Sequence, residues 1–392
     1  MTVSTGEDSS AIETGEDATV STGEDSSAIE TGKDVTVSTG EDSSAMERGE
    51  EMTVAARRPR APVMSDVGRL AGVSHQTVSR VINGSPHVRP ETRDKVLAAM
   101  EQLGYRPNSV ARALVTGRSM TLGVVSFDTT LYGPASTLFG IERAAHDAGY
   151  FIIVASLKAL NRSSVTDAVE RLRRQGVDGI LVIAPHEEAG DALLHTRADV
   201  PLVAVEAGPD EGVAVVAVDQ VAGAISATQH LLDLGHETVW HISGPPNFIE
   251  SRQRLEGWRT TLQKAGAELP EPVAGDWSPG AGYDLGQRLS RDPAVTAVFV
   301  ANDQMALGLL RAAHEAGRAV PGELSVVGFD DIPEASFFLP PLTTVRQDFI
   351  EMGRRSLRLL LNTVETGRET GPGSLVPPEL IVRASTGPGR PR

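Results

Sequence analysis

From residue 119 onward, short β-branched runs alternate with segments whose apolar residues recur every three or four positions. The runs TLGVVS, YFIIVAS, GILVIA, PLVAVE and VAVVAV predict buried strands, and the segments between them predict helices. After Gly235 the pattern repeats, with TVWHIS, TAVFVAND and LSVVGFDD as strands. Strands that alternate with helices indicate parallel sheets that are covered on both faces. We therefore expect an α/β core of two doubly wound parallel-sheet subdomains with a cleft between them.

Residues 66–83 (DVGRLAGVSHQTVSRVIN) show a different pattern, that of two short helices around a tight turn. Ala71-Gly72 interrupts the periodicity, and Ser74 is placed to cap the second helix. A third helical segment begins at Pro90 and stops at Gly104. The apolar side chains expected to form the small core of these three helices are Val67, Leu70, Ala71, Val78, Val81, Ile82, Val96, Leu97, Met100 and Leu103.

The second of these helices carries polar side chains on its outward face. Glutamine can pair with adenine and arginine with guanine in a major groove, so a helix-turn-helix with this face is a DNA-reading device. The predicted base readers are His75, Gln76 and Arg80. The residues expected to contact phosphate or a thymine methyl, or to position the module, are Ser74, Thr77, Ser79 and Asn83. Taken alone, the pattern also fits an ordinary helical hairpin with a solvated polar face.

The net charge of −16 is distributed unevenly along the chain. Residues 1–52 hold fourteen acidic and two basic side chains, whereas residues 55–118 hold eleven basic and four acidic ones. A phosphate backbone attracts a basic surface and repels an acidic one. The positive charge therefore lies on the small helical domain that is expected to read DNA. Residues 54–60 (VAARRPR) form a basic arm that is either a phosphate contact or a flexible leader.

The first 52 residues are three copies of a 17-residue repeat that restarts at Thr2, Thr19 and Thr36. Each copy is rich in Ser, Thr, Gly and acidic residues, with too few apolar residues to offset the entropy of ordering. We expect this segment to be disordered. It is either inert, or a product of an upstream start codon, or a competitor of DNA for the basic domain.

Composition narrows the remaining classes of function. The chain has no cysteine, no basic leader followed by an apolar run, and no apolar stretch near the roughly 20 residues that a membrane span needs. We expect a cytoplasmic protein without disulfides and without membrane contact. The loop GAGYDLG departs from the dinucleotide-binding spacing, and the histidines are scattered. No enzyme activity, cofactor or metal is therefore expected.

Several long motifs in a fixed order then resemble one family. They are VSHQTVSRVIN, LGYRPNSVARAL, VANDQMALG, SVVGFDD and LPPLTTVRQDF, and they are similar to the lac repressor family of bacterial transcription regulators over roughly residues 63–386. The resemblance implies a DNA-binding headpiece, a hinge helix and a core similar to periplasmic sugar-binding proteins. The implied segments are 1–53 (repeats), 54–106 (headpiece), 107–118 (hinge), 119–218 with 347–374 (N-subdomain), 219–346 with 375–386 (C-subdomain) and 387–392 (tail).

The resemblance also assigns two groups of binding residues. Val110, Ala111 and Leu114 match hinge positions that insert into the minor groove, where an apolar wedge kinks the duplex. Without the family, Leu114 would be an ordinary core or linker residue. The implied effector-binding residues are Leu131, Pro134, Thr137, Glu206, Phe248, Glu250, Arg254, Trp277, Asn302, Asp330, Gln347 and Phe349.

Each effector residue also has a purely structural interpretation. Asn302 would cap a helix, Arg254 would be solvated and Trp277 would belong to the core. Four positions depart from the family pattern: Glu206 replaces an aspartate, Phe248 and Glu250 replace serines, and Val218 replaces a phenylalanine. Extra bulk at Phe248 and Glu250 should reshape the pocket. His75 stands where the lac repressor has a tyrosine, so the operator sequence stays open.

The function that follows is a ligand-responsive repressor of sugar catabolism genes. We expect it to bind a pseudo-palindromic operator as a homodimer, since the leucine heptads that form the lac repressor tetramer do not follow the core. A small sugar would release it, with a galactoside as one candidate. The alternatives are the same regulator with a non-sugar ligand such as a purine, a solute-binding protein, or a doubly wound enzyme. The sequence leaves open whether the ligand releases or promotes DNA binding.

Overall fold

The computed structural model describes residues 60, 62–106, 113, 117–157, 161–186, 200–208, 213–367 and 373–389. The N-terminal repeats and the predicted hinge residues Val110, Ala111 and Leu114 lie outside this range. Within the described ranges, every helix is too short or too polar to cross a membrane.

Three short helices form a small N-terminal bundle, made of α1 (Met64–Ala71), α2 (His75–Ile82) and α3 (Pro90–Leu103). The predicted helix ends are confirmed. Ser74 caps α2, because its Oγ accepts a hydrogen bond from the Thr77 amide at 3.3 Å. Gly104 ends α3 in the left-handed conformation at φ 61°, which glycine adopts without strain.

The core of this bundle is smaller than predicted. Its buried side chains are Val67, Val78, Val81, Val96 and Ala99, with Ala71, Ile82, Met100 and Leu103 packed against them. The predictions for Leu70 and Leu97 were wrong, because these side chains are 45% and 50% exposed. Leu97 directly follows the buried Val96, so the turn of the helix points it away from the core. Leu70 lies three positions after the buried Val67, on the same side of its helix, and nothing local explains its exposure.

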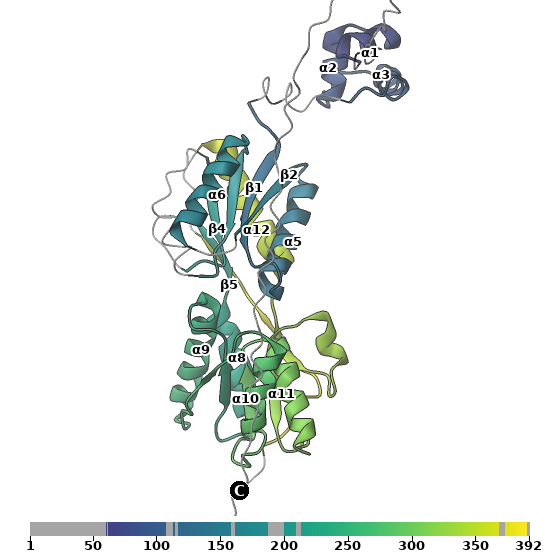
Figure 1. Ribbon diagram of the computed structural model, residues 1–392. Coiled ribbons are helices and arrows are strands. Elements are labelled where there is room, and N and C mark those ends of the chain that lie inside the picture. Colours follow the sequence, from purple (N-terminus) through teal and green to yellow (C-terminus); the bar gives the residue numbers. More distant parts are fainter. Residues whose placement is uncertain are drawn as a thin grey trace, which may run out of the picture. The chain divides into compact units, whose positions relative to one another are not determined.

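The first of two sheets has six strands in the order β11-β5-β4-β3-β1-β2, and all neighbouring strands are parallel. Its strands are β1 (Thr121–Phe127), β2 (Phe151–Leu157), β3 (Gly179–Ile183), β4 (Leu202–Val205), β5 (Val215–Val218) and β11 (Ser374–Val376). Helices α5 (Tyr132–Asp147) and α12 (Phe349–Thr366) cover one face, and α6 (Arg162–Arg174) covers the other (Figure 1).

The second sheet has the order β12-β10-β9-β8-β6-β7, and only β12 is antiparallel to its neighbour among the described strands. Its strands are β6 (Trp240–Ser243), β7 (Val273–Ala274), β8 (Ala297–Val300), β9 (Ser325–Asp330), β10 (Thr343–Arg346) and β12 (Glu379–Ile381). Helices α8 (Gln220–Asp233) and α9 (Ile249–Ala265) pack on one face. Helices α10 (Pro279–Leu289) and α11 (Asp303–Glu315) pack on the other, and a short 3-10 helix η1 (Pro333–Phe337) follows β9.

The chain passes between the two sheets at a few defined points. It leaves the first sheet after Val218, returns to it after Arg346 through α12, and leaves it again after Val376. These connections place the carboxyl ends of both sets of parallel strands toward a common region. The predicted fold class, two doubly wound parallel sheets after a helical headpiece, is confirmed.

One strand that was predicted to be buried, β2, is partly exposed. Strand β2 lies at the edge of the first sheet, and Phe151, Ile153 and Val154 are exposed on it. Helices α5 and α6 flank this strand and leave part of both its faces open. A β-branched run therefore predicted the strand correctly but not its burial.

Candidate functional site

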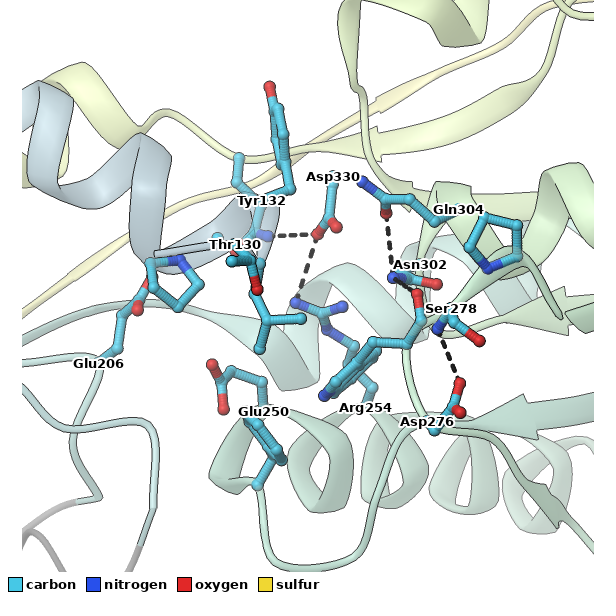
Figure 2. Close-up of a pocket in the computed structure, with 17 residues that line it drawn as sticks. Thr130, Tyr132, Glu206, Glu250, Arg254, Asp276, Ser278, Asn302, Gln304 and Asp330 are labelled. Carbon is cyan, nitrogen blue, oxygen red and sulfur yellow. Dashed lines mark hydrogen bonds and ion pairs between the residues drawn. The ribbon is translucent and has the colours of Figure 1, made fainter. Parts of the chain in front are cut away.

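A cavity of about 250 Å³ lies at the carboxyl ends of the strands and is lined by residues from both halves (Figure 2). Residues 130–134, after β1, and Glu206, after β4, come from the first half. The start of α9, the loop before α10, and the ends of β8, β9 and β10 supply the rest. This is where ligands bind in doubly wound folds, and the volume is close to the lower end of ligand pockets, about 300 Å³.

Most of the residues that the sequence assigned to the effector line this cavity. They are Leu131, Pro134, Glu206, Phe248, Glu250, Arg254, Trp277, Asn302, Asp330 and Gln347. Thr137 and Phe349 do not line it. Thr137 lies behind Glu206 and donates to it at 2.9 Å, and Phe349 belongs to the core of the first half, with its ring 5.9 Å from that of Tyr132.

Arg254, Gln347 and Asp330 line one wall of the cavity and belong to a closed ring of polar side chains that also includes the buried Gln220. Arg254 donates from Nε to Gln220 at 2.9 Å, Gln220 donates to Gln347 at 2.8 Å, and Gln347 donates to Asp330 at 2.6 Å. The guanidinium of Arg254 then lies 3.6 Å from the Asp330 carboxylate, which closes the ring. Since every member holds its neighbour, the ring presents a fixed set of donors and acceptors to a ligand.

Arg254 is buried rather than solvated. It also donates to the carbonyl of Ala301, and its guanidinium stacks on the ring of Phe329 with the central carbon 3.8 Å from the centroid. Burial raises the pKa of Asp330 to about 6, against the opposing effect of Arg254. The wall therefore holds a buried ion pair in which both members have further hydrogen-bond partners, as buried charges require.

Trp277 forms an apolar surface beside this ring. Its side chain packs over Gly244, where a Cβ atom would lie only 2.1 Å from the indole, so only glycine fits at that position. The indole Nε1 is buried and has no hydrogen-bond partner among the described residues. A flat ring with one unpaired donor is suited to a ligand that has an apolar face and polar edges.

Asn302 combines the structural and the functional interpretation. Its Oδ1 accepts from the Met305 amide at 2.9 Å and caps α11, while its Nδ2 donates to the carbonyl of Trp277 at 3.0 Å. The cap therefore also holds the loop that carries the indole. Asn302 thus positions Trp277 and lines the cavity at the same time.

Two glutamates line the side of the cavity away from Asp276, Ser278 and Asn302 (Figure 2). Glu206 is buried, and burial raises its pKa to about 7 although the Thr137 hydroxyl donates to it. Burial and the charge of Glu206 raise the pKa of Glu250 to about 8. Both groups are therefore easier to protonate than ordinary glutamates.

Backbone strain is concentrated at this cavity. Glu206, Trp277 and Asp330 have φ values of 60°, 74° and 112°, which side-chain-bearing residues rarely adopt. Each of them lines the cavity. Strained residues persist where the surrounding structure holds them in place, and they gather at binding sites.

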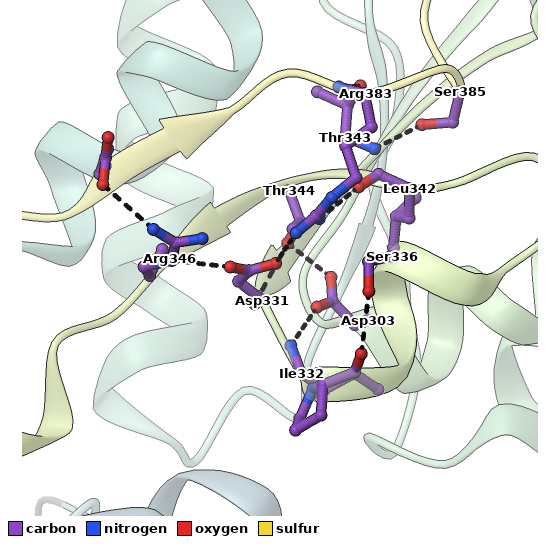
Figure 3. Close-up of polar contacts among 12 residues, drawn as sticks. Asp303, Asp331, Ile332, Ser336, Leu342, Thr343, Thr344, Arg346, Arg383 and Ser385 are labelled. Atoms are coloured by element: carbon purple, nitrogen blue, oxygen red, sulfur yellow. Dashed lines mark hydrogen bonds and ion pairs between the residues drawn. The ribbon is translucent and has the colours of Figure 1, made fainter.

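A second polar network involves Asp303 and Asp331, the residues that follow the cavity-lining Asn302 and Asp330 in the sequence (Figure 3). The buried carboxylate of Asp303 accepts from the Ile332 amide at 2.9 Å and from the Thr344 hydroxyl at 2.6 Å. The neighbouring Asp331 accepts from Arg346 at 2.7 Å and from Arg383 at 2.6 Å. These contacts fix the chain between Asp330 in the cavity wall and helix η1.

Several lining residues escaped the sequence analysis. They are Thr130, Tyr132, Gly133, Asp276, Ser278, Pro279 and Gln304. Most lie in loops, and periodicity does not indicate where a loop side chain points. Ser278-Pro279 did carry a readable signal, because Ser278 caps α10 and Pro279 occupies its first turn.

The polar face predicted on α2 is present at the surface of the helical bundle. His75, Gln76, Arg80 and Asn83 are exposed, and Thr77 and Ser79 are half-buried. The inward side of the same helix carries the buried Val78 and Val81. The helix therefore offers its polar side chains to an external partner.

The chemistry of the cavity is that of binding. Among the residues described, no three His, Asp or Glu side chains are arranged to hold a metal ion. The polar groups of the cavity wall are engaged with one another, as in the ring around Arg254.

Comparison with known proteins agrees with this organisation. Residues 63–108 match the family model of bacterial regulatory proteins, lacI family, and residues 228–386 match that of the periplasmic binding protein-like domain. The lactose operon repressor of Escherichia coli (strain K12) is 34% identical over 324 residues, which cover 82% of this chain and 89% of that protein.

Two further relatives have similar coverage. The HTH-type transcriptional regulator CelR of Thermobifida fusca is 37% identical over 84% of this chain and 99% of its own length. The HTH-type transcriptional repressor PurR of Haemophilus influenzae (strain ATCC 51907 / DSM 11121 / KW20 / Rd) is 32% identical over 82% of this chain and 98% of its own length.

Solved structures give the same result. A lac repressor dimer bound to operator and the anti-inducer ONPF is similar at a TM-score of 0.75 and 33% identity, over 84% of this chain and all of that one. A complex of CelR with cellobiose is similar at a TM-score of 0.61 and 33% identity, over 83% and 99% of the two chains. The chain therefore belongs to the lacI family of bacterial regulatory proteins, which regulate transcription and are not enzymes.

Proposed function

We propose that this protein is a repressor that binds a pseudo-palindromic operator as a homodimer and releases it when a small sugar occupies the cavity. The observation that carries the proposal is the ring of Arg254, Gln220, Gln347 and Asp330 beside the indole of Trp277. A sugar has hydroxyls at fixed angles around a ring with an apolar face. A site with fixed polar groups rejects analogues that lack a hydroxyl, because its own groups would be left unpaired.

The DNA-binding part of the proposal rests on α2. Gln76 and Arg80 are exposed on this helix and have the hydrogen-bonding groups that match adenine and guanine in a major groove. The charge of the chain supports the same role, since residues 55–118 are its basic part. The structure of a lac repressor relative bound to operator supports operator DNA as the partner.

The dimer is supported by exposed apolar side chains on both halves. Phe151 on β2 is 75% exposed, and Phe337 and Leu339, in and after η1, are 84% and 91% exposed. Large apolar groups that stay open to water at this level mark an interaction surface. A second copy of the chain is the proposed partner, and the dimeric relative bound to operator supports it.

A purine, the non-sugar alternative that the sequence leaves open, is the second candidate ligand. The polar ring around Arg254 favours the sugar. It fixes hydrogen-bonding groups on one wall, which suits the hydroxyls of a sugar. The two ligand classes are separated by experiment.

The test has two arms. Operator sites are selected from a random DNA library with the purified protein, and binding is then measured by fluorescence anisotropy at a fixed salt concentration. We expect an inverted repeat, bound at least 10-fold more weakly by Arg80→Ala and with unchanged affinity by Arg259→Ala, an exposed arginine on α9. A thermal-shift panel of sugars and purines identifies the ligand class. Absence of any selected inverted repeat, or stabilisation by purines alone, would contradict the proposal.

A further inference from the structure

The cavity holds more negative charge than its basic groups can balance. Among the described lining residues, Glu206, Glu250, Asp276 and Asp330 are acidic and Arg254 alone is basic. Arg254 is already engaged by Asp330, by Gln220 and by the carbonyl of Ala301. The positive charge of Arg254 is therefore paired with Asp330. Among the described lining residues, the two glutamates have no basic partner of their own.

Both glutamates present an oxygen that lacks a donor. The Oε2 atoms of Glu206 and Glu250 are shielded from solvent and have no hydrogen-bond partner among the described residues. Glu206 is only 5% exposed as a whole. Buried acceptors are normally satisfied, and one without a partner is costly, so a ligand donor is the natural partner for each.

The two carboxyl groups are also close enough to affect each other. The charge of Glu206 raises the pKa of Glu250, in addition to the effect of burial. Two ionised carboxylates in one wall would repel, so the ligand-free pair holds a proton, and a cation between the two groups would take the place of that proton. A neutral hydroxyl could donate to one oxygen but would leave the repulsion in place.

Aromatic rings complete the surroundings. Phe248 and Trp277 both line the cavity, and their rings lie 5.6 Å apart in an edge-to-face arrangement. Phe248 immediately precedes helix α9, which carries Glu250 in its first turn. Aromatic faces attract cations, so the rings add to the attraction of the carboxylates.

We infer that the ligand of this cavity carries a protonated amine, as an amino sugar does, and that the amine lies between Glu206 and Glu250. The inference rests on the proposed function, in which this cavity binds a sugar. It adds the class of sugar. The sugar ring lies against Trp277, the polar ring around Arg254 takes hydroxyls, and the glutamate side takes the amine.

The experiment is calorimetric titration of the full chain at pH 7 with matched ligand pairs. The pairs are glucosamine with glucose, galactosamine with galactose, and the β-1,4-linked disaccharide of glucosamine with cellobiose. In each pair, amines replace the hydroxyls at C2. For at least one pair we expect the amine to bind at least 10-fold more tightly. Glu250→Gln should remove that preference, so that the amine and the neutral sugar of the pair bind the variant with equal affinity.

A matched control separates this effect from a general change in charge. Glu256→Gln, on the exposed side of the same helix, should keep the preference. Melting curves of both variants show that they are folded, and Glu206→Gln replaces Glu250→Gln if the latter is unfolded. If the neutral members bind as tightly as the amines or more tightly, the inference is wrong and the proposed sugar-binding function stands. If no sugar of either kind binds, both are wrong.

Discussion

The guanidinium of Arg254 lies 3.6 Å from the carboxylate of Asp330, and less than a tenth of each side chain is exposed. Two hydrogen-bonded glutamines, Gln220 and Gln347, connect the same two residues by a second route. The four side chains come from α9, α8, the end of β10 and β9, which are far apart in the sequence. The ring therefore forms only when these elements of the second half are folded together.

Replacement of Arg254 should separate the stability and the binding roles of this ring. Arg254→Ala leaves Asp330 buried without its partner, which costs about 3–5 kcal/mol of unfolding free energy. Arg254→Lys keeps a positive charge but loses the planar fork, so we expect a smaller loss of stability and at least a 10-fold loss of sugar affinity. Denaturant unfolding and calorimetric titration measure the two effects. Unchanged sugar affinity in Arg254→Lys would contradict the proposed binding role.

Gly244 should control the position of Trp277. A methyl group at this residue would lie 2.1 Å from the indole, so Gly244→Ala must displace the ring. We expect sugar affinity to fall at least 10-fold and operator affinity without ligand to stay unchanged. Gly322→Ala is the control, because its added methyl would have its nearest neighbour at 3.6 Å. Equal effects of the two substitutions on sugar binding would show that the indole does not contact the ligand.

The glutamates of the cavity predict how stability depends on pH. Burial and the charge of Glu206 raise the pKa of Glu250 to about 8, while an unfolded glutamate has a pKa of about 4.3. The folded, ligand-free state therefore binds a proton that the unfolded state releases. This contribution to stability is complete below about pH 4 and is lost as the pH rises through about 8.

In the Glu250→Gln variant the glutamine side chain cannot ionise, so this variant should not lose stability as the pH rises. We expect the melting temperature of the variant to exceed that of the unmodified protein increasingly between pH 6 and pH 9, by about 2–4 °C for each kcal/mol. Scanning calorimetry across this range measures the difference. Parallel curves for the two proteins would mean that Glu250 is already ionised in the folded state at pH 6.

Charge on the apolar patch after β9 should weaken the dimer. Phe337→Asp or Leu339→Asp places a carboxylate on a side chain that the dimer is proposed to bury, where each large apolar side chain contributes about 1.5–3 kcal/mol. We expect the dimer dissociation constant to rise at least 10-fold in analytical ultracentrifugation. Leu269→Asp, on an exposed leucine outside this patch, should have no effect. A dimer that resists both patch substitutions would rule this surface out.

Local signals in the sequence were sufficient for the helices of the headpiece. Ser74, Pro90 and Gly104 each act on their own backbone, so the helix ends they predict need no tertiary information. The core was less predictable. Leu97 follows the buried Val96 directly, and only the packing of three short helices decides which of the two points inward.

The lining residues of the cavity were predictable where the family resemblance assigned them. They were not predictable where the conformation of a loop decides which side chains face the cavity. Arg254, Trp277 and Asp330 were assigned by the family resemblance, whereas Tyr132 and Gln304 were not assigned to the site. Whether a strand is buried also depends on partners outside the chain. The exposed β2 reads like a core strand because a run such as FIIVAS is equally suited to an interface.

The central claim is that a ligand in this cavity controls the hold of the headpiece on DNA. The most direct test measures operator affinity by fluorescence anisotropy, at fixed salt, while the sugar that gave the largest thermal shift is added. We expect at least a 10-fold loss of operator affinity in the unmodified protein and none in Arg254→Lys, which should bind operator normally without sugar. Operator affinity that stays constant at saturating sugar, or falls equally in Arg254→Lys, would contradict the account.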